Sequence, residues 1–454
     1  MRQKCSLILL ALCLLLTACG PAVQPEQEPE PPLEASAPEE MPAPAEEPQM
    51  PDLPQREREW VEDIEFLREK IRTEHPDPFR FCTEEEFDLK MDQLSAGVGE
   101  LSDSDIFYEL EAIITGTMGD THTRLWWDGP LPLCDRIFAV NFFPQNGKLY
   151  LLNYLEGCDQ FEPYLLHEIV GVNGVHSLYL MQRAAELYAP FNWHSTTEFP
   201  EYPSFFDWVG CDYKEGYTFQ ILNGNQEVES IEVPVITSAE ANGGTWVYPE
   251  GWGRIFFGKS EDWAEYVEGG DGGCVYLHYS ILYSTPSIVK SFDTASTLIK
   301  EHPECKKLVI DMRDHPGGSA ARLPQVRNSA GQFVSPAIEQ VYVVTGGYTA
   351  SAAVISLGIF QSLFDNMVVI GEPTGQFDPF LCVMNNEFVS PHLQYSVRIS
   401  NMWYDAETDV EKYYDEDGKL YPWESCILPD VYIHQDIEDV RQGKDSVIEW
   451  VLAQ

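Results

Sequence analysis

Short apolar runs alternate with longer amphipathic segments after Gly273, and this alternation restricts the fold of the chain more than any other feature. The spacing of the apolar residues predicts strands and helices in turn. The strands are Cys274–Tyr279, Leu308–Ile310, Val341–Thr345 and Met367–Ile370, and the helices are Pro286–His302 and Ser351–Phe364. Repeated strand–helix units form layered α/β domains. We therefore predict an α/β domain over residues 274–454.

The first 19 residues carry the pattern of an exported lipoprotein. Two basic residues precede an apolar run from Leu7 to Leu16, which is too short for a stable spanning helix but suits a signal-peptide core. Small residues before Cys19 resemble the lipobox of bacterial lipoproteins, in which this cysteine is lipidated. An ordinary secretory signal that ends beside Cys19 is the alternative. We expect a lipid anchor at Cys19 that tethers the protein to the extracytoplasmic face of the bacterial membrane.

Residues 20–56 are predicted to be a disordered spacer. Eleven prolines alternate with Glu and Ala in this segment, and no basic residue occurs before Arg56. A composition of this kind cannot bury enough apolar surface to fold, and its prolines favour an extended backbone. The spacer would hold the folded body away from the membrane.

Residues 57–128 are predicted to form a small helical region. Apolar residues from Trp60 to Ile71 recur at helical spacing. Thr83 followed by Glu86 is a capping box that opens a second helix, and Ser104 is expected to cap a third. The region ends in the sequence Gly119–Thr123, in which Asp120 is expected to hold the turn.

Residues 129–240 change to a β-rich pattern. Asn-Gly pairs at 146–147, 173–174 and 223–224 each lie between apolar runs, which is the strongest short hairpin signal. The segment Leu166–Gly174 resembles the turn region of a PDZ-like module. Residues 241–273 are rich in Gly and Trp and are predicted to be a connector.

Charge and cysteine usage exclude several functions. The 454 residues include 74 acidic and 28 basic side chains, a formal net charge of −46. Such a surface repels phosphate, so nucleic acid is not expected as a partner. No cysteine shows the spacing of a zinc site. The acidic run Asp405–Asp417 lacks the glycine and the terminal glutamate of a calcium loop, and we expect a solvated loop there. No metal and no cofactor is predicted.

Two glycine-containing turns follow predicted strands. Ser351 comes after the Gly346-Gly347 turn and opens a helix, where backbone N–H groups favour negative charge. Taken alone, this serine is better explained as a helix N-cap. Gly317 and Gly318 end the second turn, Asp311–Gly318, and two such glycines either expose N–H groups as an oxyanion hole or simply reverse the chain.

Considered together, these segments resemble the C-terminal processing (tail-specific) serine peptidase family, whose relatives include the core domain of tricorn protease. The matching motifs, in order, are Gly119–Thr123, Asp311–Gly318, Thr349–Ala353, Gly371–Gly375, Leu428–Asp430 and Gly443–Asp445. The resemblance covers nearly all of the chain from Trp60. It implies a helical N-terminal region, a β-rich PDZ-like insert and a catalytic domain of the ClpP/crotonase type.

The resemblance also implies roles for individual residues. Ser351 would be the nucleophile, and the N–H of Ala352 with that of Gly317 or Gly318 would form the oxyanion hole. One branch of the family uses a lysine as the base, but Gln376 occupies the corresponding place here and cannot accept a proton usefully. The Ser/Lys mechanism is therefore excluded.

The tricorn-like branch instead uses a histidine preceded by a small hydroxyl residue, with a glutamate shortly before a Pro-Asp pair. His122, Thr121 and Glu424 match these positions. An imidazole can act first as base and then as acid, and a carboxylate that orients it completes the set. A histidine that merely ends a helix is the alternative for His122.

The sequence therefore predicts a membrane-tethered extracytoplasmic serine peptidase that hydrolyses peptide bonds through an acyl-enzyme on Ser351. Its partners would be peptide or protein substrates, with the membrane reached through Cys19. The main alternative is a catalytically inactive lipoprotein that binds peptides or other ligands on the same scaffold. An esterase or other acyl transferase that uses the same serine is a third possibility.

Overall fold

The structure is a computed structural model that describes residues 53–127, 135–145, 147–188, 199–211, 216–249, 262–280, 282, 285–376, 380–404 and 427–454. The predicted signal peptide, most of the predicted spacer, the acidic run 405–417 and Glu424 lie outside these ranges. None of the helices within them combines the length and hydrophobicity needed to cross a bilayer. The first helix begins at Gln55, inside the predicted spacer, because Arg56 binds the carbonyls of Val98 and Leu101.

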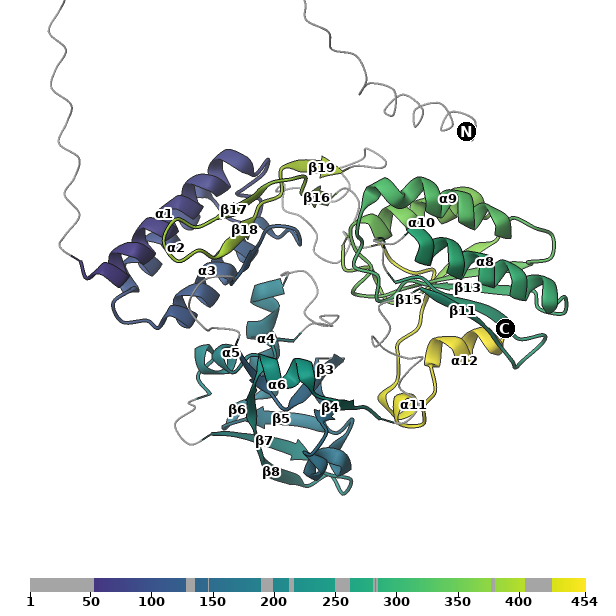
Figure 1. Cartoon of the computed structure of the whole chain (residues 1–454), viewed down its shortest axis with the longest axis horizontal. Helices are drawn as coiled ribbons and strands as arrows, with labels where there is room; N and C mark the ends of the chain where they lie inside the picture. Colours follow the sequence, from purple (N-terminus) through teal and green to yellow (C-terminus); the bar gives the residue numbers. More distant parts are fainter. Residues whose placement is uncertain are drawn as a thin grey trace, which may run out of the picture. The chain divides into compact units, whose positions relative to one another are not determined.

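A six-stranded sheet forms the centre of the C-terminal region (Figure 1). All neighbouring strands are parallel except the first pair, which is antiparallel. The order is β11 (Trp263–Val267), β12 (Cys274–His278), β13 (Lys307–Asp311), β14 (Gln340–Thr345), β15 (Met367–Gly371) and β20 (Val431–Tyr432). The four strands predicted here are confirmed within one residue at each end.

Helices cover both faces of this sheet. One face packs against α8 (Thr285–Glu301), α9 (Leu323–Ala330) and α10 (Ala352–Leu363). Alternate residues of the same strands face α12 (Ser446–Leu452) on the other side. Tyr276 and Val309, for example, lie in the core with Val447 and Ile448, while their neighbours Leu277 and Leu308 lie in the core of α8–α10. The prediction of a layered α/β architecture is confirmed, but the sheet begins earlier than predicted, because β11 lies in the predicted connector 241–273 and pairs with β12.

A buried ion-pair network joins α12 to this sheet. Arg313 Nε lies 2.9 Å from one carboxylate oxygen of Asp311, and Arg313 Nη2 lies 2.8 Å from Asp445 Oδ2. Asp445 also caps α12 by accepting the N–H of Val447. Burial raises the pKa of the Asp311 carboxyl, but the charge of Arg313 and its hydrogen bonds outweigh burial and hold this pKa below its usual value. Asp311 and Arg313, the first part of the Asp311–Gly318 motif, therefore have a structural role: they attach α12 to the sheet.

We predict that Asp445→Ala lowers the free energy of unfolding by about 3–5 kcal/mol, because it leaves the buried Arg313 guanidinium with an incomplete set of partners. Urea denaturation measures this value. Glu438→Ala is the matched control, since Glu438 pairs with Arg441 on an exposed surface and its removal should cost about 0–1 kcal/mol. Equal effects of the two substitutions would contradict this account of the network.

Three helices form the N-terminal region: α1 (Gln55–Glu74), α2 (Glu84–Gly97) and α3 (Asp103–Met118). The predicted capping box of Thr83 and Glu86 is confirmed. The prediction that Ser104 caps the third helix is wrong. Ser102 is the N-cap of α3, because its side chain and that of Asp105 bind each other's backbone N–H groups, and this places Ser104 inside the first turn.

A late segment of the chain joins this helical region. Strand β1 (Arg124–Trp126) pairs with β18 (Ser396–Arg398), which pairs in turn with β17 (Glu387–Val389). Next to this sheet, β16 (Phe380–Cys382) pairs with β19 (Met402–Tyr404). Tyr395 is fully buried among the aromatic residues of the N-terminal core and stacks on Trp60. Residues 387–399 therefore pack with the helices, although they follow β15 in the chain.

The β-rich region is an antiparallel sheet with the predicted hairpins. Its main order is β10-β4-β5-β7-β8, with β3 beside β4 and β6 beside β5. The strands are β3 (Val140–Gln145), β4 (Lys148–Leu155), β5 (Glu168–Val172), β6 (Val175–His176), β7 (Tyr217–Leu222), β8 (Val228–Val233) and β10 (Trp246–Val247). The other strands and α-helices of the described residues are β2 (Arg136–Phe138), β9 (Val235–Thr237), α4 (Ser177–Tyr188), α5 (Pro203–Trp208), α6 (Ser238–Gly243) and α11 (Ile437–Arg441).

Candidate active site

Ser351 lies in the turn between β14 and α10, at the carboxyl edge of the parallel sheet. Its backbone has φ 54° and ψ −126°, a conformation that costs a non-glycine residue about 1–3 kcal/mol. The side chain of Thr349 helps to hold the turn, since it donates to Met312 O at 2.7 Å and accepts the N–H of Gly346 at 3.0 Å. Although Ser351 is at the N-cap position, its hydroxyl makes no capping hydrogen bond. The alternative of a simple helix cap is therefore not supported.

His122 lies in a turn after α3 that is organised by a buried carboxylate. Asp120 Oδ1 accepts the backbone N–H groups of His122 and Thr123 at 2.7 and 2.8 Å and the hydroxyl of Ser400 at 2.8 Å. Its Oδ2 lies 2.9 Å from Nε2 of His75. Burial raises the pKa of the Asp120 carboxyl, but the contact with His75 and the hydrogen bonds outweigh this effect and lower the pKa to about 2. Asp120 holds the turn, as expected.

The fold brings His122 and Ser351 together across 229 positions of sequence. His122 Nε2 lies 3.0 Å from Ser351 Oγ, which is within the range required for proton transfer. Thr121 Oγ1 lies 3.4 Å from the other ring nitrogen, Nδ1. Glu424, the expected orienting carboxylate, lies outside the described residues. The arrangement places an imidazole within proton-transfer distance of a hydroxyl, which is the geometry that a serine nucleophile with an adjacent base requires.

The glycine turn approaches Ser351 closely. A Cβ atom on Gly317 would lie 2.6 Å from Ser351 Cβ and 3.0 Å from Ala352 N, and Gly317 has φ +107°. The backbone N–H groups of Gly318 and Ala352 have no acceptor among the described residues. They are therefore the N–H groups that remain for an oxyanion.

The N–H of Gly317 is not free for this role, which corrects one of the expected alternatives. It donates to His315 Nδ1 at 2.9 Å. His315 is fully buried, and its ring packs edge-on against Tyr279. Burial, together with the charge of His278, lowers the pKa of His315 to about 3, so this imidazole is neutral and its Nδ1 can accept. Gly318 is therefore the better partner for Ala352.

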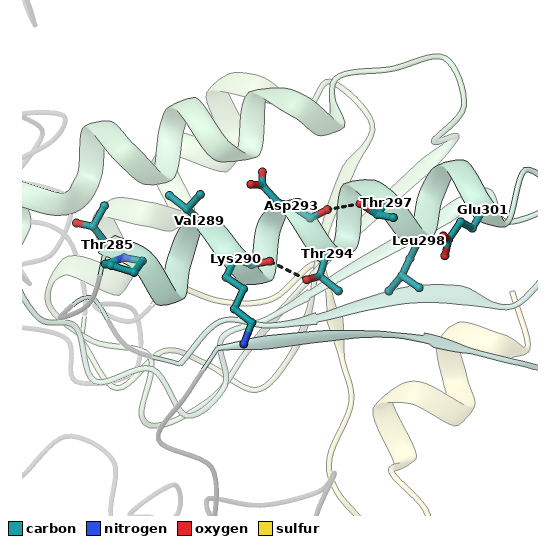
Figure 2. A pocket seen from close by; sticks show the side chains of 9 residues that line it. Thr285, Val289, Lys290, Asp293, Thr294, Thr297, Leu298 and Glu301 are labelled. Carbon is teal, nitrogen blue, oxygen red and sulfur yellow. Dashed lines mark hydrogen bonds between the residues drawn. The ribbon is translucent and has the colours of Figure 1, made fainter.

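The described residues contain no cluster of three or more His, Cys, Asp or Glu that could hold a metal. The six described cysteines are free thiols: Cys82, Cys158, Cys211, Cys274, Cys305 and Cys382. An open groove of about 750 Å³ runs along α8 (Figure 2). The hydroxyls of Thr294 and Thr297 on this face donate to carbonyls of the same helix, and none of the lining residues belongs to the Ser351 site.

The fold places several residues at this site whose contacts the sequence did not predict. His75 and Ser400 bind Asp120, and His315 binds Gly317. Gln376, excluded above as a base, contacts both His122 and the backbone of Ser351. Two of these residues carry a signal in the sequence: Gln376 directly follows the Gly371–Gly375 motif, and His315 lies inside the Asp311–Gly318 motif. The contacts of His75 and Ser400 join distant segments and have no such signal.

No protein-family model matches the sequence, and no curated protein matches it. Solved structures do match. Mature CPAF complexed with lactacystin has a TM-score of 0.55 at 11% identity, covering 87% of this chain and 98% of that chain. Mature CPAF alone gives the same score and identity, with 87% and 97% covered. A serine-to-alanine mutant of CPAF gives 0.53 at 9% identity, again with 87% and 97% covered. This chain shares the fold of CPAF.

We predict that Gly317→Ala abolishes reaction of Ser351 with a fluorophosphonate probe, because the new methyl group would collide with the serine Cβ. Labelling is measured by intact-protein mass spectrometry. Gly358→Ala is the matched control: Gly358 lies on the exposed side of α10 with nothing within 4 Å of a new Cβ, so labelling should persist and stability should rise slightly. Normal labelling of Gly317→Ala would refute the close approach.

Proposed function

We propose that this protein is a serine peptidase of the C-terminal processing family, closest to its tricorn-like branch, that hydrolyses peptide bonds through an acyl-enzyme on Ser351. The single observation that carries the proposal is the distance of 3.0 Å between His122 Nε2 and Ser351 Oγ. A serine hydroxyl needs an adjacent base to become a nucleophile, and an imidazole is well suited to this task. The similarity of fold to CPAF over 87% of the chain agrees with the proposal.

In the proposed mechanism His122 accepts the proton of Ser351 as the hydroxyl oxygen attacks the peptide carbonyl carbon. The N–H groups of Ala352 and Gly318 stabilise the resulting oxyanion. His122 then donates its proton to the leaving amine, which produces the acyl-enzyme. Water, activated by the same imidazole, releases the acid product and restores the serine. Glu424 would orient the imidazole during these steps, with Thr121 beside its Nδ1 atom.

The proposal extends to the architecture around this site. The α/β region would be a catalytic domain of the ClpP/crotonase type. The β-rich region would be a PDZ-like module that presents an extended peptide by strand addition. Its antiparallel sheet with short hairpins is compatible with this role. Lipid chains on Cys19 would hold the enzyme at the extracytoplasmic face of the membrane.

We predict that a fluorophosphonate probe labels the wild-type protein at Ser351, as identified by peptide mass spectrometry. Ser351→Ala should abolish labelling and peptide hydrolysis. His122→Ala should reduce both by ~10³-fold or more, because the serine then has no base. Circular dichroism serves as the folding control for each variant.

The possible outcomes separate the candidate functions. Labelling without hydrolysis of any peptide, but with hydrolysis of simple esters, would favour an esterase or acyl transferase. No labelling of a folded wild-type protein would contradict the peptidase and favour a binding lipoprotein.

The membrane anchor is tested separately. We predict that Cys19→Ser moves the protein, expressed in a bacterial host, from the membrane fraction to the soluble extracytoplasmic fraction, since the lipid would have no attachment site. Metabolic labelling with an alkyne fatty acid measures the modification directly. Incorporation of the fatty acid into the Cys19→Ser protein would contradict the assignment of the anchor.

A further inference from the structure

The side chain of Gln376 is buried between the two reacting residues. Only 4% of this residue is exposed. Its Oε1 accepts the backbone N–H of Ser351 at 2.5 Å, and its Nε2 lies 3.4 Å from Nδ1 of His122. A buried amide needs polar partners at both ends, and here the partners are the backbone of the proposed nucleophile and the ring of the proposed base.

The contact with Ser351 fixes the orientation of this amide. A backbone N–H can only donate, so the Gln376 oxygen must face Ser351. The NH₂ group must then face His122. The choice between the oxygen and nitrogen positions, which is often ambiguous for a glutamine, is determined here by the chemistry of the neighbours.

The backbone around Gln376 is held against the serine turn. Thr374 Oγ1 donates to Gln376 O at 2.6 Å, and the N–H of Gly375 donates to Thr349 O at 3.1 Å. A Cβ atom on Gly375 would lie only 1.9 Å from Gly347 O, so this segment packs directly on the Gly346–Ser351 turn. Gln376 is thus fixed relative to Ser351 from both its backbone and its side chain.

We propose that Gln376 is a positioning residue for the Ser351–His122 pair. Its side-chain oxygen holds the nucleophile in the positive-φ conformation, and its NH₂ group tunes the protonation of His122 by disfavouring a proton on the adjacent Nδ1 atom. The inference rests on the proposed function of this site. An amide donor beside Nδ1 disfavours both the imidazolium and the neutral Nδ1–H tautomer that leaves Nε2 free to accept the serine proton. A carboxylate in the same place would stabilise both of these forms.

Other titratable groups lie near His122 and must be kept constant in a test. Asp120 binds its backbone N–H, and His75 pairs with Asp120. The thiol of Cys382 in β16 is close enough to Asp120 for this charge to raise the pKa of the thiol, after the larger effect of burial. Glu424 is the proposed partner of the ring. Substitution of Gln376 alone leaves all four groups in place.

The test is the pH dependence of kcat/KM, or of the rate of Ser351 labelling, in Gln376→Glu and Gln376→Ala. The glutamate is isosteric, retains an acceptor for Ser351 N–H and places a negative charge beside Nδ1. We expect it to move the acid limb of the profile upward by about one pH unit or more. Gln376→Ala removes the acceptor, so the rate should fall about 10–100-fold at the optimum, without a comparable upward movement of the acid limb.

Gln442→Glu is the matched control, because Gln442 is exposed after α11 and the substitution adds the same charge outside the site. It should leave the profile unchanged. An acid limb of Gln376→Glu that coincides with that of the wild type would overturn the tuning role, and full activity of Gln376→Ala would overturn the positioning role. An inactive wild-type protein would instead contradict the proposed function.

A second readout does not require activity. Nitrogen-15 NMR of labelled histidines in the Ser351→Ala background follows the titration of His122, whose signal is assigned by its loss in His122→Asn. The same upward movement is expected on adding Gln376→Glu, and an unchanged titration would refute the inference.

Discussion

A contact between an imidazole and a hydroxyl joins two parts of the chain that are 229 residues apart. Each partner is fixed by its own set of buried polar groups. On the histidine side, the Asp120 carboxylate accepts hydrogen bonds from two backbone N–H groups and one hydroxyl, and it pairs with His75. On the serine side, Thr349 and Gln376 hold the turn. The 3.0 Å distance therefore results from two separately rigid turns, and a change in either would disturb it.

The fold supplies these turns through non-local packing. The hydroxyl that binds Asp120 belongs to Ser400, which follows β18, and β18 reaches this place because it pairs with β1. The strained backbone of Ser351 is tolerated because hydrogen bonds from neighbouring strands and loops determine its conformation. Strain of this kind is typical of functional sites, where it exposes a reactive side chain.

Local patterns in the sequence were sufficient for much of the architecture. The spacing of apolar residues and the glycine turns predicted strands β12–β15, and the Asn-Gly pairs predicted the hairpins of the β-rich region. The motif order also placed Ser351 and His122 in one site. The pairing of β1 with β18 could not be foreseen, because it joins segments that share no local signal. The sequence did distinguish Ser102 from Ser104 as a cap residue, because an acidic side chain, Asp105, follows Ser102 by three residues, whereas Phe107 follows Ser104. The hydrogen bond from Gly317 N–H to His315 and the two contacts of Gln376 could not be predicted, because they depend on how the side chains are placed in the folded protein.

Chemical rescue tests the central claim, that His122 is the base for Ser351, most directly. His122→Gly leaves a cavity where the ring was, and free imidazole can occupy it. The account predicts that this variant labels slowly at Ser351 with a fluorophosphonate, and that added imidazole restores the rate in a saturable manner that increases with the fraction of neutral imidazole. A His122→Gly protein that labels at the wild-type rate without imidazole would contradict the account, since some other group would then be activating the serine.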